Sequence, residues 1–439
     1  MVRSWSNWAG TSAAEPSGRL RPLDVDAAAE ALRAAVRDGR TVRPLGSGHS
    51  FTGIGAPEGA LALDLSAWSG IVRADRDSGL VTARAGTPLH RLNAELDALG
   101  LALPNLGDID RQTVAGALAT GTHGTGARLG GLAAQVAELE LLLADGTTRR
   151  CSPTAHPELF AAARVGLGAL GVVTEVTLRC VPAFALAADE RPVPLDAVLE
   201  GFDELVDGND HAEFYWFPHS PLALVKRNNR LPADAEPAPL PPWRHHVEYE
   251  LLENRLFGAV CRIGRALPGL VRPLNRLCGA TWSARSYSDR SHRVFTTPRS
   301  VRFVESEYAV PRESLVDVLR ELRAAVRGLE HPVMFPVEVR VADADDAWLS
   351  TAHRRRSAYV AVHQFAGMPY RHWFSVLADI ADAAGGRPHW GKLHRLDAAA
   401  LRERYPRFDD FGRVRAEVDP GGTFRNPYLD RVLGPRPCG

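Results

Sequence analysis

The sequence of 439 residues predicts an α+β protein of two domains. Short strands interleave with helices over residues 1–180, and the same alternation returns over residues 181–385. Within the second stretch, residues 228–243 (NNRLPADAEPAPLPPW) are too rich in proline to be regular and are predicted to form a surface loop or linker. The tail, residues 386–439, has turn signals at DPGG and RNPY and is expected to pack back on the body.

The elements of the first domain follow from local patterns. Residues 24–38 have apolar side chains at helical spacing and end at Gly39, and a second helix is predicted from about Leu89 to Leu99. The strand TVRPL enters the glycine turn GSGHS at 46–50. Further strands are predicted at ALALDLS, GLVTARAG, VAELELLLADG and GVVTEVTL.

The second domain carries a strongly amphipathic helix at residues 312–327, with Leu315, Val316, Leu319 and Leu322 on one face. Strands are predicted at VRFVESEYAV, PVEVRVA and AYVAVHQF. A helix around residues 371–384 separates the last of these from the motif PHWGK.

Composition excludes several classes of protein. Hydrophobic residues make up 45% of the chain, so intrinsic disorder is excluded. Lys+Arg and Asp+Glu both number 52, and this zero net charge gives no reason to expect binding to nucleic acid or to an anionic membrane surface. Lys226 and Lys392 are the only lysines, as in proteins from GC-rich genomes, and a retained lysine favours a functional role for Lys392.

Cysteine usage and the N-terminus indicate the compartment. The odd number and wide spacing predict neither a disulfide framework nor a zinc site for Cys151, Cys180, Cys261, Cys278 and Cys438. No signal-peptide pattern opens the chain, and no apolar stretch approaches the ~20 residues of a membrane span. We expect a cytoplasmic protein without a bound metal, and a monomer, although the charge balance does not decide oligomeric state.

Two glycine-rich segments could approach a phosphate closely. VRPLGSGHSFTGIG at residues 42–55 is not a Rossmann fingerprint, because the residues after its glycines cannot start a helix. Residues 116–131 interleave six glycines with Thr120, Thr122, Thr125 and His123. Main-chain N–H groups and hydroxyls of such loops can envelop a pyrophosphate. The alternative is a simple bend between strands, but two such loops, each with one histidine, favour cofactor binding.

These segments resemble a known family. GSGHS, NLGDIDRQTVAGALATGTHGTG and GVVTEVTL resemble the PCMH-type FAD-binding domain of the vanillyl-alcohol oxidase superfamily. PHWGK and RYPRFDDFGRVRAEVDPGGTFRNPYL resemble the end of its sugar-1,4-lactone oxidase and alditol oxidase branch, which includes gulonolactone and arabinonolactone oxidases. The resemblance covers residues 1–180 and 335–439, whereas residues 181–330 match only in general layout.

The resemblance implies a fold and a cofactor. It implies an FAD-binding domain of two α+β subdomains at residues 1–180, an α+β substrate (cap) domain at 181–385, and a segment at 386–439 that closes the active site. His49 is expected to carry the flavin covalently, although some relatives hold FAD without a bond, and His123 is expected to be structural. The residues expected to bind FAD are Pro44, Gly46, Ser47, Gly48, His49, Ser50, Gly107, Thr113, Gly116, Ala117, Thr120, Gly121, His123, Gly124, Gly126 and Val173.

The resemblance also assigns catalytic residues. Glu338 and Arg340 share one face of a predicted strand, and by spacing alone they would be a surface ion pair. Related oxidases have a matching Glu-x-Arg that faces the flavin, which implies that Glu338 accepts hydrogen bonds from substrate hydroxyls and Arg340 holds the reacting oxygen. Lys392 of HWGK is implied to lie at the reacting end of the substrate. The implied catalytic residues are Glu338, Arg340 and Lys392, and His389 and Thr113 are implied to join them in binding substrate.

The implied activity is that of an FAD-dependent oxidase. A hydride would pass from a carbinol carbon to flavin N5, and O2 would be reduced to hydrogen peroxide. Gly107 leaves room for O2 where dehydrogenase relatives carry alanine. Phe365 offers an apolar wall that favours a lactone or a bulkier alcohol over a polyol. The substrate that the resemblance implies is an aldono-1,4-lactone of gulono or arabinono type. The alternatives are an alditol oxidase, a dehydrogenase with another acceptor, a tailoring alcohol oxidase of secondary metabolism, and a sugar-binding relative without flavin.

Overall fold

The structure is a computed structural model that describes residues 4–435, so Cys438 lies outside the described residues. Helix α1 (Val25–Arg37) packs on a parallel sheet of order β3-β5-β4, formed by Gly18–Leu20, Leu61–Asp64 and Val42–Leu45. Asp24 caps the helix by accepting a hydrogen bond from the Ala27 N–H at 2.8 Å. The predicted helix and the strands that follow it are therefore confirmed.

An antiparallel sheet of order β10-β9-β11-β7-β6 lies next along the chain. Its strands are Thr148–Cys151, Val136–Leu142, Val172–Arg179, Leu80–Arg84 and Ile71–Asp75. The helices of this part are α2 (Leu89–Ala98), α3 (Val114–Ala119) and α4 (Pro157–Ala163), with short 3-10 turns at Gly53–Gly55 and Leu132–Gln135. Strand β6 was missed from sequence because its residues are mostly exposed and do not alternate. Two-residue strands pair Trp5–Ser6 with Ala13–Ala14, and Leu101–Ala102 with Val181–Pro182.

The second half of the chain builds an eight-stranded antiparallel sheet of order β16-β13-β15-β14-β18-β19-β17-β20. In that order the strands are Arg285–Arg290, Ala185–Pro194, Leu222–Arg230, His211–Trp216, Val337–Ala342, Ser357–Phe365, Phe303–Pro311 and Arg387–Pro388. Helices α5 (Leu195–Glu200), α6 (Phe202–Asp207), α11 (Leu315–Ala325) and α12 (Arg371–Ala383) share an apolar core with it. The strands predicted at VRFVESEYAV, PVEVRVA and AYVAVHQF are confirmed as β17, β18 and β19.

Alternation along these strands separates two faces of the large sheet. Val337, Val339 and Val341 of β18 belong to the apolar core beneath the helices. Because successive side chains of a strand point to opposite faces, Glu338 and Arg340 point away from that core. The same period places charged residues of β14 and β17 on this second face, which becomes one wall of the site described below.

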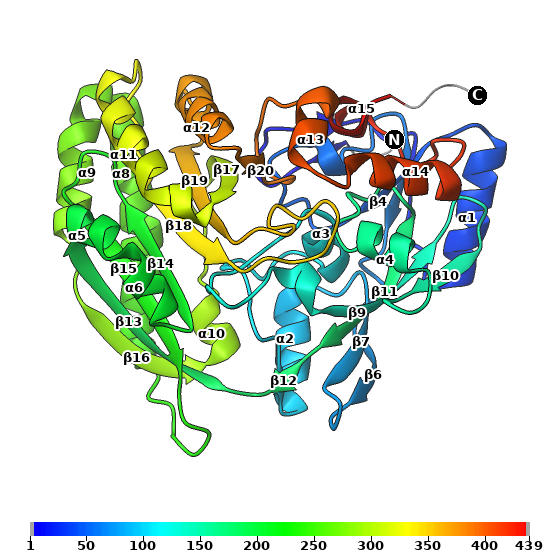
Figure 1. Ribbon diagram of the computed structural model, residues 1–439, viewed down its shortest axis with the longest axis horizontal. Coiled ribbons are helices and arrows are strands. Elements are labelled where there is room, and N and C mark those ends of the chain that lie inside the picture. Colours follow the sequence, from blue (N-terminus) through cyan, green and yellow to red (C-terminus); the bar gives the residue numbers. More distant parts are fainter. Residues whose placement is uncertain (1–3, 436–439) are drawn as a thin grey trace.

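A helical insertion joins β15 to β16. It consists of α7 (Pro242–His245), a π-helical segment (His246–Leu256), α8 (Phe257–Ala266), a 3-10 turn (Pro268–Leu270) and α9 (Val271–Ala280). The irregular loop predicted at 228–243 is shorter than expected, because β15 continues to Arg230 and α7 begins at Pro242. Figure 1 places α8 and α9 at the end of the molecule opposite the C-terminal helices.

The tail crosses from the large sheet to the first half of the chain. After β20, helices α13 (Ala398–Arg404), α14 (Phe408–Val418) and α15 (Pro427–Leu433) share a core with the five-stranded antiparallel sheet and its helices (Figure 1). The remaining short elements are α10 (Ser291–Phe295) and 3-10 turns at Arg312–Ser314 and Val326–Gly328. Among the described residues, no helix has the length and apolar character needed to cross a bilayer.

Candidate active site

Two cavities meet in the middle of the molecule. A narrow cavity runs between the first glycine turn and α3, and a wide cavity of about 660 Å³ lies between that region and the charged face of the large sheet. Both are lined by His49, Ser50, Gln112 and Thr120. These four residues therefore mark the junction at which a molecule in one cavity would touch a molecule in the other.

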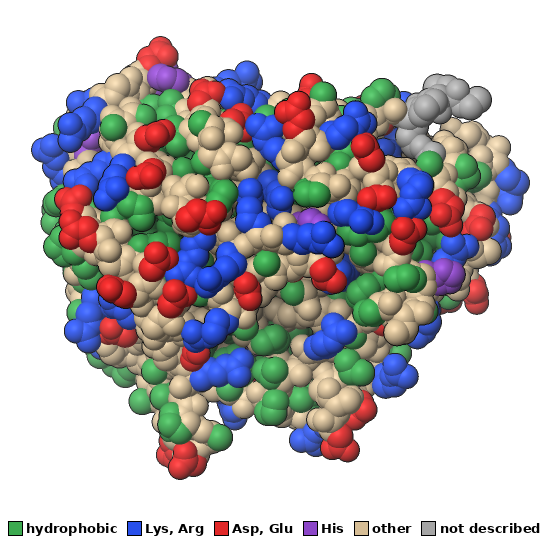
Figure 2. All heavy atoms as spheres, viewed as in Figure 1, with side chains coloured by type: hydrophobic (Ala, Val, Ile, Leu, Met, Phe, Trp, Pro, Cys, Tyr) green, Lys and Arg blue, Asp and Glu red, His purple; other side chains and the backbone are tan. Residues whose placement is uncertain are grey.

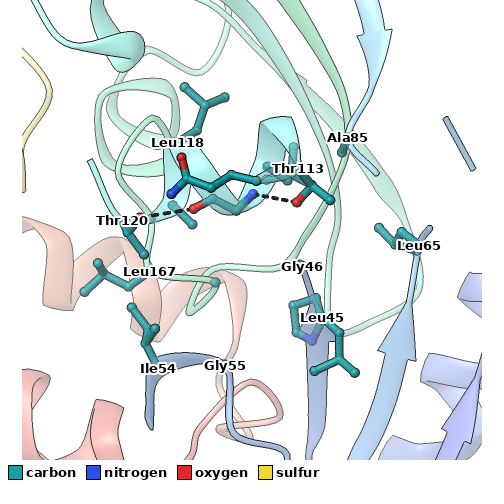
Figure 3. A pocket seen from close by; sticks show the side chains of 18 of the residues that line it. Leu45, Gly46, Ile54, Gly55, Leu65, Ala85, Thr113, Leu118, Thr120 and Leu167 are labelled. Carbon is teal, nitrogen blue, oxygen red and sulfur yellow. Dashed lines mark hydrogen bonds between the residues drawn. The ribbon is translucent and has the colours of Figure 1, made fainter. Parts of the chain in front are cut away.

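The narrow cavity has the shape of a backbone cradle. A Cβ added to Gly46 would lie 3.0 Å from Thr113 Oγ1 and 3.6 Å from Gly116 Cα, so the two segments approach closely only because this residue is glycine. The Gly116 N–H donates to Thr113 Oγ1 at 3.2 Å, and Thr120 Oγ1 donates to the Gly116 carbonyl at 3.2 Å (Figure 3). Arg43 also lines this cavity, but it donates to the carbonyls of Leu167, Gly168 and Phe424.

The cradle fits an elongated cofactor with a pyrophosphate. Close backbone and hydroxyl groups suit phosphate oxygens, and the apolar remainder of the lining suits the flat rings of FAD. Of the residues expected to bind the cofactor, those that line this cavity are Pro44, Gly46, Ser47, Gly48, His49, Ser50, Thr113, Gly116, Thr120 and Val173.

Six other residues of that expected set lie elsewhere. Gly107 and His123 line the wide cavity. Within the described part of the chain, neither cavity lining includes Ala117, Gly121, Gly124 or Gly126. The Gly126 N–H donates to the Val341 carbonyl at 2.9 Å and so ties this loop to the large sheet. The second glycine-rich segment thus serves partly to join the two halves of the molecule.

Lys392 is held in the wide cavity by two carboxylates from β17. Its Nζ lies 2.5 Å from Glu305 Oε1 and 2.8 Å from Glu307 Oε2. His123 Nε2 lies 3.0 Å from the other oxygen of Glu307, and His363 Nε2 lies 3.3 Å from Glu305 Oε1. The side chains of both glutamates are at least nine-tenths buried. The ammonium group is therefore fixed in position rather than free to rotate.

Arg340 is the centre of a second cluster. Its guanidinium pairs with Glu338, and its Nε lies 2.8 Å from Glu213 Oε2. The Tyr215 hydroxyl donates to Glu338 Oε1 at 2.9 Å, and Asp108 Oδ1 lies 3.6 Å from the guanidinium. All these residues line the cavity or contact a residue that does. The pair that spacing alone would place on a surface is thus buried in the site.

Burial and neighbouring charges shift the pKa values of these groups. Burial opposes ionisation of Glu307, but Lys392 and His123 outweigh it and hold the pKa of this carboxyl well below its usual range. Burial raises the pKa of Glu338, and Arg340 only partly counteracts that effect. Burial, with Lys392 nearby, lowers the pKa of His389 to about 3, so this imidazole is neutral.

Two groups in the cavity have the ligand types of a metal site. His123, Glu307 and His389 form one, and Glu305, Glu338 and His363 form the other, each with ligand atoms within 4.8 Å of one another. Lys392 pairs with one carboxylate of each group. A divalent cation would therefore have to displace this ammonium group.

The structure adds functional candidates that the sequence did not indicate. Glu305 and Glu307 lie in the predicted strand VRFVESEYAV, where their spacing of two was the available signal, the same one that drew attention to Glu338 and Arg340. Lys226 also lines the wide cavity, as do Glu190 and Arg285, so both lysines of the chain line one cavity.

One expectation needs revision. Phe365 was expected to form a wall of the pocket, but it packs in an apolar cluster and Phe335 lines the wide cavity instead. Thr113 lines the narrow cavity, where its hydroxyl accepts from the Gly116 N–H, and its contact with substrate stays a prediction. His389 and Lys392 do line the wide cavity, together with Glu338 and Arg340.

Comparison with known proteins agrees with this arrangement. The D-arabinono-1,4-lactone oxidase family profile matches residues 176–432, and an FAD binding domain profile matches residues 16–152. An L-gulono-1,4-lactone dehydrogenase of Mycobacterium tuberculosis is 43% identical over 431 residues, which cover 98% of this chain and 99% of that protein. An L-gulonolactone oxidase of Mus musculus is 33% identical, with 98% of both chains covered. An alditol oxidase of a Streptomyces species is 32% identical, with 99% of this chain and 100% of that protein covered.

Solved structures agree on the fold. A solvent-stable cholesterol oxidase superposes with a TM-score of 0.83 at 20% identity, covering 98% of this chain and 97% of that one. A cholesterol oxidase from Brevibacterium sterolicum gives 0.82 at 17% identity, with 98% and 96% covered. At such identities the likeness concerns the fold alone, which is that of vanillyl-alcohol-oxidase-type flavoenzymes. Taken with the whole-length sequence matches, it establishes that the chain belongs to the D-arabinono-1,4-lactone oxidase family of FAD-linked oxidoreductases.

Proposed function

We propose that the protein oxidises an aldono-1,4-lactone of gulono or arabinono type, with FAD held in the narrow cavity and the lactone in the wide one. The observation that carries this proposal is the meeting of the two cavities at His49, beside the two buried clusters, one around Lys392 and the other around Arg340 and Glu338. When bound, FAD supplies the hydride acceptor for oxidation of a carbinol carbon.

The chain's own residues bind and orient the lactone. Arg340 and Lys392 remain charged, because burial works against their charge but the adjacent carboxylates outweigh it and raise both pKa values. They provide fixed positive charge for the oxygen that becomes a carbonyl. Glu338 accepts hydrogen bonds from substrate hydroxyls in its ionised form. His389 Nδ1 accepts from the Gly391 N–H at 3.1 Å, so the neutral ring carries its proton on Nε2 and acts as a donor.

A substrate panel tests this assignment. The purified protein, saturated with FAD, is assayed with L-gulono-1,4-lactone, D-arabinono-1,4-lactone and glucitol, an alditol with as many carbons as gulonolactone. The proposal predicts the higher kcat/KM for a lactone. A preference for glucitol would support the alternative, an alditol oxidase, which the Streptomyces relative favours.

We propose that His49 carries the flavin covalently. His49 lies at the junction of the cavities and stacks on Trp8 at a ring-centroid distance of 6.1 Å. Burial, with Arg111 nearby, lowers its pKa, so the ring is neutral and has a nitrogen lone pair available for a bond. Acid precipitation tests the bond: a yellow pellet is expected for the natural protein and a yellow supernatant for His49→Ala. Yellow supernatants from both proteins would show that FAD is held without a bond.

We propose O2 as the electron acceptor, on the basis of Gly107. This residue lines the wide cavity next to His123, and a Cβ there would lie 3.2 Å from the His123 carbonyl oxygen. Gly107→Ala should lower peroxide formation while leaving reduction of an artificial dye in place. The Mycobacterium relative, which is named a dehydrogenase, favours the alternative that another electron acceptor replaces O2. Negligible peroxide formation by the natural protein, together with rapid dye reduction, would show that the protein is such a dehydrogenase.

We propose the domain division at residues 1–180, 181–385 and 386–439 that the sequence indicated. The change from β12 to β13 near residue 182 and the packing of α13–α15 on the first half support it. Ala347, Trp348 and Leu349 also join the core of the first half, so the two halves are packed together and neither boundary is expected to be cut first. Limited proteolysis should first cut the irregular loop between residues 231 and 241, which lies between β15 and α7. Stable fragments that end near residues 182 and 386 would support the division, whereas stable fragments that end within 1–180 would argue against it. The cytoplasmic location and the monomeric state stay predictions.

A further inference from the structure

Exposed apolar side chains gather on the helical insertion. Among the described residues, thirteen large hydrophobic side chains are exposed, and eight of them lie between residues 243 and 277. The most exposed leucines of the insertion are Leu277 at 59%, Leu267 at 56% and Leu256 at 54%. Scattered exposed leucines are ordinary on a protein surface, but a concentration on one structural element indicates an interaction surface.

Helices α8 and α9 carry unbalanced positive charge, whereas the acidic residues of the insertion, Glu248, Glu250 and Glu253, all lie in the π-helical segment before them. Residues 254–288 include no Asp or Glu, although acidic residues number 52 in the chain. Over this stretch, five exposed cations form no ion pair with any residue that the structure describes: Arg255, Arg262, Arg265, Arg272 and Arg276. Although the net charge of the whole chain is zero, these five arginines therefore form a local basic surface.

The position of this surface relates it to the active site. Leu252, Leu256 and Leu277 are exposed and also line the wide cavity. Helices α8 and α9 form the left end of the molecule in Figure 1, and Figure 2 shows hydrophobic and basic side chains, with a few acidic ones, interspersed along that edge. The outer side of these helices is thus continuous with a rim of the cavity.

We propose that the insertion, residues 242–282, docks the protein on the surface of an anionic lipid bilayer. Helices that lie in a membrane interface combine leucine and tryptophan side chains with arginines that meet the lipid phosphates. A second copy of the chain is a poorer occupant, because a two-fold dimer on this surface would bring like-charged arginines face to face. Docking places the cavity rim beside the lipid, so O2, the apolar reactant of the proposed function, reaches the site directly from the bilayer.

Vesicle flotation tests the proposal with the FAD-loaded protein. Vesicles of phosphatidylcholine alone are compared with vesicles that also contain phosphatidylglycerol, at low and high salt. The apolar variant is Leu267→Gln/Leu270→Gln, and the charge variant is Arg262→Gln/Arg272→Gln/Arg276→Gln; none of these residues lines either cavity. Matched controls on the opposite half of the chain are Leu20→Gln/Leu23→Gln and Arg21→Gln/Arg37→Gln/Arg73→Gln.

Binding to the anionic vesicles is expected for the natural protein and both controls. The charge variant should lose about 100-fold in partition coefficient, because each basic residue near an anionic surface contributes a factor of roughly 5. High salt should weaken binding of the natural protein, and lactone oxidation should be unchanged in all variants.

Failure to bind anionic vesicles would overturn the proposal, as would equal losses in the variants and their controls. Sedimentation velocity without lipid tests whether a second copy of the chain occupies this surface instead. A dimer that Leu267→Gln/Leu270→Gln dissociates would assign the surface to a second copy and overturn the lipid assignment.

Discussion

Replacing Lys392 with methionine should destabilise the folded protein because it leaves two buried carboxylates without their cationic partner. Glu305 and Glu307 lie 2.5 Å and 2.8 Å from the ammonium nitrogen, and their side chains are only 8% and 2% exposed. Two unit charges ~4 Å apart attract by about 4 kcal/mol at an effective dielectric constant near 20. Removing one partner of a buried pair costs roughly 3–5 kcal/mol, because the remaining charge stays desolvated. We expect Lys392→Met to lower the free energy of unfolding by that amount at neutral pH.

Urea denaturation and a double-mutant cycle measure this effect. Lys392→Met, Glu307→Gln and the double variant are unfolded at the same FAD concentration, and the coupling energy between the two positions is expected to be about 2 kcal/mol or more. Arg402→Met with Asp409→Asn provides the matched control, because that ion pair is exposed and should couple by less than about 1 kcal/mol.

The destabilisation should also depend on pH. The pKa of Glu307 is depressed in the folded protein, so its pairing stabilises the fold at neutral pH and that contribution is lost as pH falls through the folded-state pKa. The difference between the natural protein and Lys392→Met should therefore shrink in acid. A coupling energy no larger than that of the exposed control pair would refute the claim that Lys392 is fixed by its carboxylates.

The remaining predictions concern catalysis with the lactone. The pKa of Glu338 is raised, so kcat/KM should fall as pH drops through a value above the usual glutamate range, and Glu338→Gln should remove this acid limb; an unchanged limb would contradict the role of Glu338. Tyr215→Phe removes a hydrogen bond to Glu338 and should move the limb to higher pH, whereas a shift to lower pH would show that Tyr215 acts otherwise. Arg340→Lys loses the fork that meets Glu213 and Glu338, so kcat/KM should fall roughly 10- to 100-fold; near-normal turnover would show that any cation suffices.

The large sheet shows what local patterns can and cannot predict. Alternation identified β18 and β19 from sequence, because every residue of each strand is buried and their two faces differ in character. It missed β13, whose ADERPVP end mixes charge with two prolines. The order of the eight strands depends on pairings such as β14 with β18, which join residues more than a hundred positions apart. No local pattern contains that information.

The site was predicted in part for the same reason. Glu338, Arg340 and Lys392 were found because they lie in motifs that resemble a family. Glu305 and Glu307 lie in a segment without such a motif, and only the pairing of β17 with β19 and β20 brings them to Lys392. The basic surface of α8 and α9 escaped notice because a sum of charges over the chain averages out a local excess.

Anaerobic reduction tests the central claim most directly. The purified protein with bound FAD is mixed with L-gulono-1,4-lactone or D-arabinono-1,4-lactone without O2, and the yellow flavin band is followed. The account predicts that a lactone bleaches the band rapidly and that Lys392→Met bleaches far more slowly, while Arg402→Met behaves like the natural protein. A protein that binds FAD but is not bleached by either lactone would contradict the assignment of the wide cavity to lactone oxidation.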